Sequence, residues 1–164
     1  MTPFSIERLG PGHDRREFAS GSDALDRYFR EYVTQDIRRR VASCYVAVDA
    51  ESGQVAGYYT LAASGVPLRE LPSEVAKRLP RYPLVPVARL GRLAVDSAYQ
   101  GRKLGGALLW DSAVRATRSD MAVFALVVDA KDGRAEAFYR HHGFASFASA
   151  PLQMILPLTN VRGV

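Results

Sequence analysis

Hydrophobic and polar positions along this chain follow two repeating patterns, which predict a mixture of strands and helices. Apolar stretches rich in β-branched and aromatic residues, bounded by turn-forming residues, are typical of strands. Such stretches occupy residues 4–9, 43–49, 54–63, 87–95, 122–129, 144–147 and 152–156. Apolar residues spaced three or four positions apart predict helices from 22 or 23 to about 40, over 102–118 and over 133–142. The expected fold class is therefore α/β (α+β).

The first predicted helix has a capped start and one apolar side. Ser22 or Asp23 is suited to cap it, because a short polar side chain accepts hydrogen bonds from the free N–H groups of the first turn. The residues expected on its buried side are Leu25, Tyr28, Phe29, Tyr32 and Val33.

The connections around the third predicted strand differ in length. Residues 50–53 are turn formers and predict a hairpin between 43–49 and 54–63. Residues 67–86 are rich in proline around a short helical piece at 73–79. Because long connections in compact domains often carry function, we expect residues 67–86 to border the substrate site.

The middle of the chain predicts a parallel βαβ unit. The strand at 87–95, the helix at 102–118 and the strand at 122–129 follow one another in the required order. Ligands of such units bind at the carboxyl ends of the strands. A ligand is therefore expected to meet Leu93, Ala94 and Val95 before the turn.

The composition is that of one cytosolic domain spanning residues 1–164. This length suits a single domain, and 48% hydrophobic residues can form a core. The N-terminus lacks the pattern of a signal peptide, and no apolar run approaches membrane-spanning length. Cys44 is the single cysteine, and the adjacent His141 and His142 point to different helix faces. No metal site is therefore expected.

Glycines open the predicted helix at 102–118 and indicate an anion-binding loop. Gly101, Gly105 and Gly106 lack a Cβ, so a phosphate can approach the free N–H groups of the first turn, where the helix dipole favours negative charge. Arg102 and Lys103 add positive charge. The pattern fits neither the Walker motif nor the dinucleotide motif Gly-x-Gly-x-x-Gly. Taken alone, such glycines are more often a packing or capping feature.

Two segments together resemble the GCN5-related N-acetyltransferase (GNAT) family. The spacing Arg102-x-x-Gly105-x-Ala107 resembles the motif with which this family holds the pyrophosphate of acetyl-CoA. Downstream, residues 136–144 resemble the Phe-Tyr-x-x-x-Gly-Phe segment that ends the last helix of the same family. Lys103 departs from the pattern, because many members have glycine at this position.

The resemblance implies acetyl-CoA as co-substrate and a mixed central sheet with helices on both faces. The sheet would be splayed at the strand that carries Leu93 to Val95. There the pantetheine arm would pair like an added strand, and a backbone N–H would polarise the thioester carbonyl. The implied cofactor-binding residues are Leu93, Ala94, Val95, Gln100, Gly101, Arg102, Lys103, Leu104, Gly105, Gly106 and Ala107.

Residues 18–26, 57–62 and 90–96 extend the resemblance, over nearly the whole chain, to the GNAT toxins of bacterial toxin–antitoxin pairs. Those toxins acetylate the α-amino group of aminoacyl-tRNA, which blocks translation, and a small ribbon-helix-helix antitoxin silences them. The resemblance implies a cytoplasmic type II toxin with aminoacyl-tRNA and such an antitoxin as partners. It also implies contact with operator DNA only through the antitoxin, and a homodimer as a possible assembly.

Tyr139 is the candidate general acid. A phenol has a pKa near 10, so it is protonated at neutral pH and can give its proton to a CoA thiolate of comparable basicity. Most tyrosines instead pack their ring and hydrogen-bond their hydroxyl, and helix spacing does not separate these roles. The match to Phe-Tyr-x-x-x-Gly-Phe implies the catalytic role, because the tyrosine at this place is the acid in the resembling toxins.

Basic residues offer candidate contacts to RNA. The net charge of +5 favours an anionic partner. Arg38, Arg39 and Arg40 close the first helix, and with Arg92 they are the candidate tRNA-binding residues, since arginine forks suit phosphate. Cations at a helix C-terminus also complement the helix dipole and can be merely solvated, so both interpretations of the triplet stay open.

Two other functions stay open. The same fold and cofactor motif would serve a housekeeping acetyltransferase that acts on a small amine or a protein N-terminus. A transcriptional co-regulator bound to the antitoxin is the other alternative, although no helix offers a convincing DNA-recognition surface of its own.

Asp111 interrupts the apolar side of the predicted helix at 102–118. A carboxylate in such a position requires a partner, and Arg89 or Arg92 on the neighbouring strand is the hypothesised one.

Overall fold

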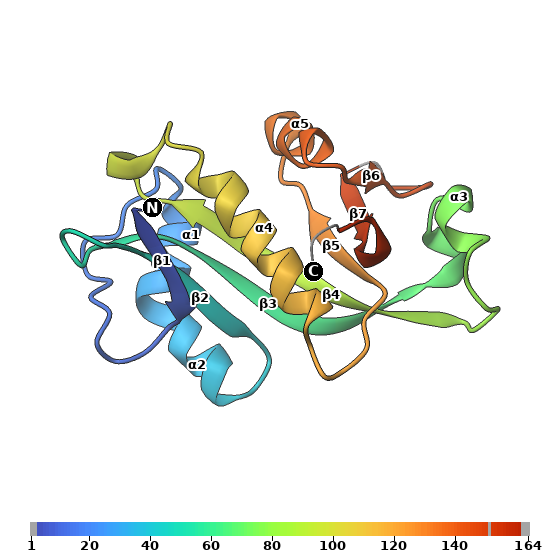
Figure 1. Cartoon of the computed structure of the whole chain (residues 1–164), viewed down its shortest axis with the longest axis horizontal. Coiled ribbons are helices and arrows are strands. Elements are labelled where there is room, and N and C mark those ends of the chain that lie inside the picture. Colours follow the sequence, from blue (N-terminus) through green and yellow to red (C-terminus); the bar gives the residue numbers. More distant parts are fainter. Residues whose placement is uncertain (1–2, 151, 162–164) are drawn as a thin grey trace. The chain divides into compact units, whose positions relative to one another are not determined.

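The computed structural model describes residues 3–150 and 152–161 (Figure 1). In these ranges the strands form one mixed sheet with the order β1-β2-β3-β4-β5-β7-β6, and the predicted fold class is confirmed. The chain divides into two compact units. Unit 1 contains Met1–Ala62 and Gly91–Ser112, and unit 2 contains Ala63–Leu90 and Ala113–Val164.

The strands of unit 1 form an antiparallel arrangement. β1 (Phe4–Arg8) pairs with β2 (Ser43–Asp49), and β2 pairs with β3 (Val55–Pro67), as the predicted hairpin requires. β3 is longer than predicted and continues into unit 2.

Helices pack on both faces of these strands, because successive residues of β3 point to opposite sides. On one side the Tyr58 ring stacks on Phe29, with ring centroids 4.2 Å apart, and Phe18 packs edge-on against both rings. On the other side Gly57 lies against α4 (Leu104–Thr117), where an added Cβ would come within 2.9 Å of Leu108. Glycine at 57 therefore allows the close approach of α4.

The predicted helix at 22–40 is a helical segment with a π-helical turn in its middle. α1 (Asp23–Arg27) leads into this turn (Tyr28–Tyr32) and then into α2 (Val33–Arg38). The Ser22 side chain caps α1 by accepting a hydrogen bond from Leu25 N, as expected.

The prediction that Tyr32 lies on the buried side of this helix is wrong. Its side chain is 43% exposed, whereas Val33 is fully buried. Val33 N donates to the carbonyl of Tyr28, five positions earlier, so the π-helical turn shifts the phase of the following residues by one position. The ordinary helical spacing cannot reveal such a shift.

Unit 2 is built around a parallel strand pair. β4 (Leu84–Val95) pairs with β5 (Ala125–Asp129) from Val87↔Ala125 to Leu90↔Val128, which confirms the predicted parallel connection through α4. β7 (Gln153–Pro157) pairs antiparallel with β5, and β6 (Ala145–Ser146) pairs with β7. Val87, Val127 and Ile155 are fully or almost fully buried in the core of this unit.

The remaining helices of unit 2 agree with the prediction in place but not in every boundary. α5 spans Gly133–His141, and the helical piece expected at 73–79 is the single turn α3 (Ser73–Ala76). β4 begins before the predicted residue 87 even though Pro86 lacks an N–H. The strand continues there because the carbonyl of Pro86 still accepts a hydrogen bond from Phe124 N. In the described ranges, no helix is long and apolar enough to cross a membrane.

Candidate active site

The loop between β4 and α4 forms the candidate anion site of unit 1. It contains one 3-10 turn (Ser97–Tyr99), then Gly101 with φ +83° and Lys103 with φ +62°. The first helical hydrogen bond of α4 runs from Ala107 N to the carbonyl of Lys103. The backbone N–H groups from Lys103 to Gly106 therefore have no acceptor within the helix. We call residues 100–107 the cradle.

The backbone at Lys103 explains why a glycine suits this position. A φ of +62° is the left-handed region, which is easy for glycine and costs an L residue about 1 to 2 kcal/mol. This turn ends the loop and starts α4 at Leu104, two residues later than predicted. The long side chain of Lys103 is exposed, so the strain lies in the backbone and not in its packing.

A buried carboxylate that the sequence interpretation missed holds the loop before the cradle. Asp96 is 6% exposed, and its two oxygens accept hydrogen bonds from Ala19 N (3.0 Å) and Ala98 N (2.9 Å). Ser97 N also donates to the carbonyl of Ala19 at 2.8 Å. The local signal was an Asp directly before a turn, which is a good capping residue, but its contact with Ala19 is 77 positions distant.

Two cradle side chains are already engaged within unit 1. The amide of Gln100 donates to the carbonyls of Ser20 (2.8 Å) and Val95 (3.0 Å), which ties the cradle to the loop before α1. The Arg102 guanidinium lies over the Tyr99 ring, 5.3 Å from its centroid. Gly101 is exposed and Gly105 and Gly106 are half-buried, so the backbone of the cradle remains accessible.

The last residues of β4 extend past the part of the strand that pairs with β5. The register with β5 ends at Leu90, so Leu93, Ala94 and Val95 lie outside it. Arg92 N donates to the hydroxyl of the buried Thr60 at 3.1 Å, which holds this part of β4 against β3.

The side chain of Arg92 packs inside unit 1. Its guanidinium carbon lies 3.5 Å from the centroid of the Tyr28 ring, and the Tyr28 hydroxyl donates to Asp36 at 2.7 Å. One face of the guanidinium is therefore occupied by the ring. The predicted contact of Arg92 with tRNA stays a prediction.

Tyr139 lies on α5 in unit 2. Asp132 caps this helix by accepting a hydrogen bond from Ala135 N at 2.9 Å. The Tyr139 ring packs against Phe138 and Phe144, with centroids 5.2 and 5.4 Å away, and burial raises the pKa of Tyr139 to about 12. Within the described ranges its hydroxyl has no hydrogen-bond partner, so the proton remains available to a ligand.

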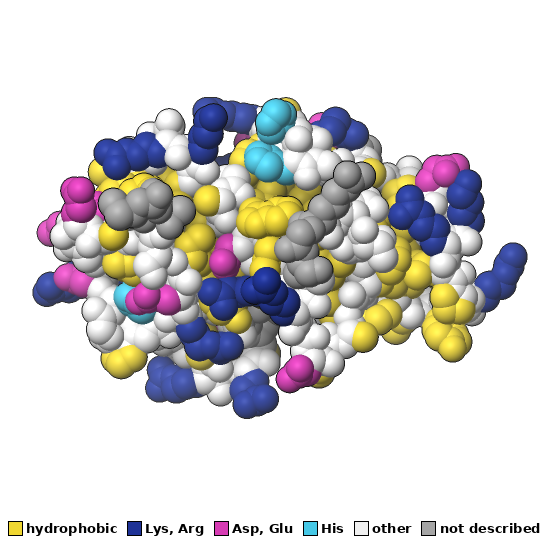
Figure 2. All heavy atoms as spheres, in the orientation of Figure 1, with side chains coloured by type: hydrophobic (Ala, Val, Ile, Leu, Met, Phe, Trp, Pro, Cys, Tyr) yellow, Lys and Arg dark blue, Asp and Glu magenta, His cyan; other side chains and the backbone are white. Residues whose placement is uncertain are grey.

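The arginine triplet closes α2 with a left-handed residue. Val41 N donates to Asp36 O and Arg40 N to Ile37 O, and Arg40 has a φ of +62°. This is the arrangement in which glycine is usual. All three arginine side chains are exposed, and Figure 2 shows Lys and Arg side chains over the end of α2.

The hypothesis that Arg89 or Arg92 pairs with Asp111 is wrong. Tyr59, which is fully buried, donates its hydroxyl to Asp111 at 2.6 Å. Arg89 instead pairs with Asp129 at 2.9 Å. Tyr59 and Asp129 are distant in sequence from Asp111 and Arg89, so the helix pattern carried no information about these two contacts.

Neither a metal-binding cluster nor an activated thiol occurs among residues 3–150 and 152–161. No group of three or more His, Cys, Asp or Glu side chains there could hold a metal ion. Cys44 is 1% exposed, and burial raises the pKa of its thiol to about 12, so it is not an activated nucleophile.

Comparison with known proteins gives matches over the whole chain. A family model described as an acetyltransferase (GNAT) domain matches residues 40–146. A tRNA-acetylating toxin of Mycobacterium tuberculosis is 33% identical, with 100% of this chain and 98% of that protein covered.

Two solved structures have the same fold at higher than 25% identity. AtaT complexed with acetyl-methionyl-tRNAfMet gives a TM-score of 0.87 at 27% identity and covers 96% of each chain. AtaTR bound with AcCoA gives a TM-score of 0.82 at 27% identity, with 98% of this chain and 97% of that chain covered.

The left-handed backbone at residue 103 leads to a stability prediction. Lys103→Gly is expected to be more stable than Lys103→Ala by about 1 kcal/mol, because only glycine relieves the strain at positive φ. Urea unfolding of both variants measures the difference. The same pair at the exposed Lys131 is the control, where alanine should be the more stable residue. Equal stabilities for the two variants at 103 would contradict the left-handed assignment.

Proposed function

This chain belongs to the GNAT acetyltransferase family and, within it, to the tRNA-acetylating toxins, and from this premise we propose that it transfers acetyl from acetyl-CoA to the α-amino group of aminoacyl-tRNA. The observation that carries the proposal is the 33% identity to a tRNA-acetylating toxin over the full chain. The family model also spans both the cradle and Tyr139. An acetylated amine can no longer form a peptide bond, so the product blocks translation.

Acetyl-CoA is the co-substrate, and we propose that the cradle binds its pyrophosphate. The free N–H groups at the start of α4 are suited to this task by charge and by direction. Leu93, Ala94 and Val95 would pair with the pantetheine arm through their backbone, and an N–H there would polarise the thioester carbonyl. This role needs no special side chain, in agreement with the apolar residues present.

Proton transfer is the proposed role of Tyr139. The amine attacks the thioester carbon, the C–S bond breaks, and the thiolate takes the phenol proton. The nitrogen then loses one proton, through water, to the phenolate, which restores the acid. Because burial raises the pKa of Tyr139 to about 12, the hydroxyl stays protonated throughout the physiological range. The α-amino group of an esterified amino acid is weakly basic and partly free at neutral pH, so a strong general base is unnecessary.

The proposed partners follow from the family. They are aminoacyl-tRNA, bound in part by the exposed Arg38, Arg39 and Arg40 and by Arg92, and a small ribbon-helix-helix antitoxin. Operator DNA would be contacted only through that antitoxin, and a homodimer is the proposed assembly. Because charged tRNA is cytoplasmic, the proposed place of action is the cytoplasm.

A substrate competition tests the proposed function. Purified protein with labelled acetyl-CoA is offered charged tRNA, deacylated tRNA, free amino acids and a peptide in parallel reactions. We expect label on the amino acid of charged tRNA and none on deacylated tRNA. Preferential labelling of the free amine or the peptide would instead assign a housekeeping acetyltransferase.

Gly105→Val tests the cradle. A β-branched side chain at this position should keep the pyrophosphate from the free N–H groups and weaken acetyl-CoA binding about 10- to 100-fold, the loss of one or two charge-assisted hydrogen bonds. Isothermal calorimetry on the folded variant measures this. The control Gly133→Val places the same residue at the start of α5, where an added Cβ meets open space, and should leave the affinity unchanged. Unchanged affinity in Gly105→Val would remove the pyrophosphate from the cradle.

Tyr139→Phe tests the general acid. The kcat should fall about 10²- to 10⁴-fold while the affinity for acetyl-CoA is retained, since only the proton donor is lost. In the wild type, kcat should not decline as the pH rises to about 10, because the protonated acid persists below the raised pKa of about 12. Tyr32→Phe removes an exposed phenol and is the control. Near-normal single-turnover transfer by a folded Tyr139→Phe protein would exclude this role.

A further inference from the structure

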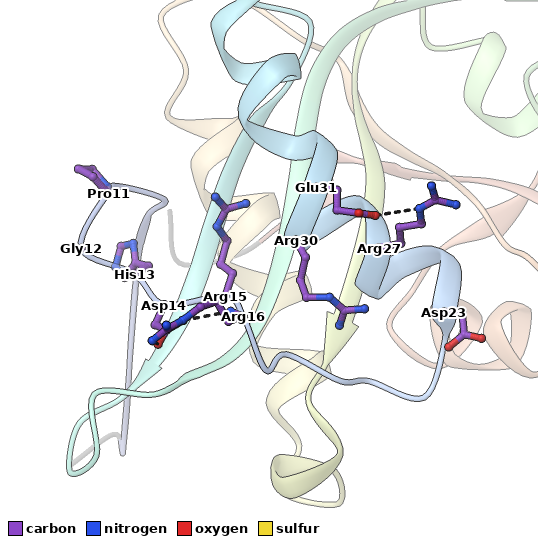
Figure 3. A pocket seen from close by; sticks show the side chains of 10 residues that line it. All are labelled: Pro11, Gly12, His13, Asp14, Arg15, Arg16, Asp23, Arg27, Arg30 and Glu31. Carbon is purple, nitrogen blue, oxygen red and sulfur yellow. Dashed lines mark hydrogen bonds and ion pairs between the residues drawn. The ribbon is translucent and has the colours of Figure 1, made fainter.

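Several basic side chains of unit 1 are already held by other groups of the protein. They line an open pocket of about 820 Å³ (Figure 3). Carboxylates pair with two of its arginines and main-chain carbonyls bind the other two, namely Arg16 and Arg27, and Arg15 and Arg30. The side chains of Arg15 and Arg30 point in different directions in Figure 3, and Asp23 adds a further carboxylate to the wall.

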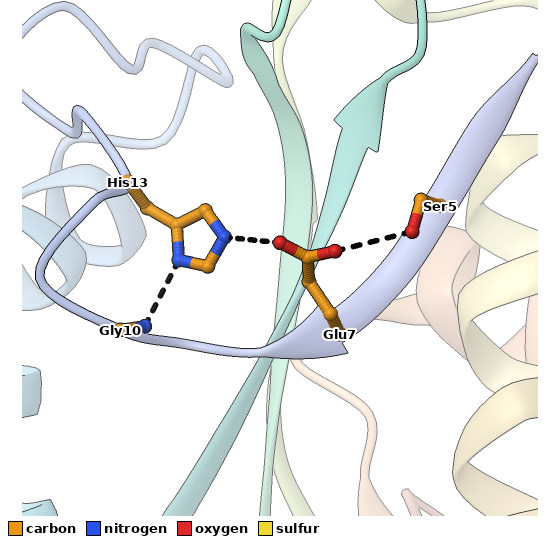
Figure 4. A network of polar contacts seen from close by, with 4 residues as sticks. All are labelled: Ser5, Glu7, Gly10 and His13. Atoms are coloured by element: carbon orange, nitrogen blue, oxygen red, sulfur yellow. Dashed lines mark hydrogen bonds and ion pairs between the residues drawn. The ribbon is translucent and has the colours of Figure 1, made fainter.

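The histidine of the same pocket is engaged as well. Figure 4 shows that His13 Nδ1 accepts the N–H of Gly10 at 2.9 Å and that His13 Nε2 lies 2.6 Å from Glu7 Oε1. The Ser5 hydroxyl donates to the other oxygen of Glu7 at 3.1 Å. These contacts bind the loop that contains His13 to β1 without a ligand.

The connection between β3 and β4, in unit 2, differs because most of its basic side chains are unpaired. We call residues 68–83 the lobe; they include four basic and two acidic residues. Lys77 pairs with Glu74 at 2.9 Å, and the second carboxylate, that of Glu70, is half-buried. The other three basic residues are exposed, and across the described ranges no ion pair or hydrogen bond engages their side chains; they are Arg69, Arg78 and Arg81.

An aromatic ring without a partner lies beside these arginines in the sequence. Tyr82 is 68% exposed. Across the described ranges its side chain makes no ring contact, cation–π contact or hydrogen bond. Figure 2 shows basic and hydrophobic side chains over α3 and the chain that follows it, together with acidic groups. A planar ligand can therefore stack on the Tyr82 ring without displacing a protein group.

Apolar packing and backbone hydrogen bonds hold the lobe in place. Leu71 is 3% exposed and packs in the core of unit 2. Tyr82 N donates to the carbonyl of Pro80 at 2.9 Å, and Leu68 N donates to the carbonyl of Pro83 at 3.0 Å. The two prolines also fix φ on both sides of Tyr82. The ring is thus carried by an ordered backbone, which lowers the entropy lost when a ligand binds.

We propose that the lobe binds unpaired nucleotides of the tRNA, with Tyr82 stacking on a base and Arg78 and Arg81 binding separate phosphates of the same strand. This inference rests on the proposed function, which supplies the polyanion. Unpaired cations beside an open aromatic ring are the combination that binds single-stranded nucleic acid.

The ring decides between the possible anionic partners. The bases of an RNA duplex are stacked on one another, so an exposed ring finds a free base only where nucleotides are unpaired. An acidic protein segment would match the charges of the lobe but would give the ring of Tyr82 no base to stack on. Single-stranded RNA accounts for both the arginines and the ring.

Two substitutions at one position test the stacking. Tyr82→Leu keeps an apolar side chain but removes the ring, so the affinity for tRNA should fall about 5- to 100-fold, the worth of one stacked base. The slope of log K against log salt should not change, because no charge is lost. Tyr82→Phe keeps the ring and should keep the affinity. Anisotropy titration of labelled tRNA over a salt series measures both quantities. Unchanged affinity in Tyr82→Leu, or an equal loss in Tyr82→Phe, overturns the proposal.

The arginines are tested by the salt slope. Arg78→Gln and Arg81→Gln should each make the slope shallower by about 0.7, the value for one lost phosphate contact with a single strand. The control Arg118→Gln removes an exposed arginine of unit 2 outside the lobe, which has no ion pair in the described ranges, and should leave the slope unchanged. A slope that flattens as much in Arg118→Gln as in Arg78→Gln reports the total charge only, and the proposal fails.

An unpaired RNA oligonucleotide and an RNA duplex of equal length test the kind of partner. Tyr82→Leu should weaken binding of the oligonucleotide and leave binding of the duplex unchanged. Equal weakening for both overturns the choice of unpaired nucleotides. If Arg78→Gln/Arg81→Gln binds every RNA as the wild type does but no longer binds polyglutamate, the lobe belongs to an acidic protein partner and the proposal fails.

The acetylation assay separates this inference from the proposed function. If the wild type acetylates charged tRNA and Tyr82→Leu binds tRNA normally, the inference fails and the transferase function stands. If the wild type does not acetylate charged tRNA but its affinity for unpaired RNA depends on Tyr82 and Arg78, the proposed function fails and the RNA-binding lobe stands.

Discussion

The buried carboxylate of Asp96 is the constraint on which the geometry of unit 1 depends. It accepts one hydrogen bond from Ala98, at the start of the cradle loop, and one from Ala19, in the loop before α1. Removing this carboxylate would take the shared acceptor from one N–H in each loop. Asp96 therefore holds the loop before the cradle against the loop before α1.

Recognition by backbone explains the character of the candidate site. The cradle and the end of β4 offer backbone N–H groups, so their side chains need only leave room for the ligand to approach the backbone. Glycine at 101 and 105 meets that need, and Lys103 adopts a glycine-like φ at an energetic cost. Tyr139 is the one proposed side-chain contribution, and its half-buried position against Phe138 and Phe144 raises the pKa of a phenol that is already protonated at neutral pH. The proposed binding of acetyl-CoA thus depends mainly on the position of backbone N–H groups and little on the identity of the side chains.

The arginines of this chain have different roles despite their similar appearance in the sequence. Arg89 pairs with a carboxylate, Arg92 packs on an aromatic ring, and Arg15 and Arg30 bind main-chain carbonyls. The net charge of +5 indicates an anionic partner without showing where it binds. An arginine held by a carbonyl keeps its full charge, whereas one paired with a carboxylate is neutralised.

Local pattern determined the order of strands and helices, the glycine-opened start of α4 and the segment around Tyr139, because periodicity, capping and turn preferences act over a few residues. Only the tertiary structure decided which side chains and backbone groups form hydrogen bonds with one another. Asp111 binds Tyr59 and not an arginine of β4, and Asp96 binds Ala19 from 77 positions away. The exposure of Tyr32 follows from a π-helical turn that no spacing rule anticipates. Such contacts depend on which side chains the folded backbone brings within 3 Å, and sequence spacing carries no measure of that distance.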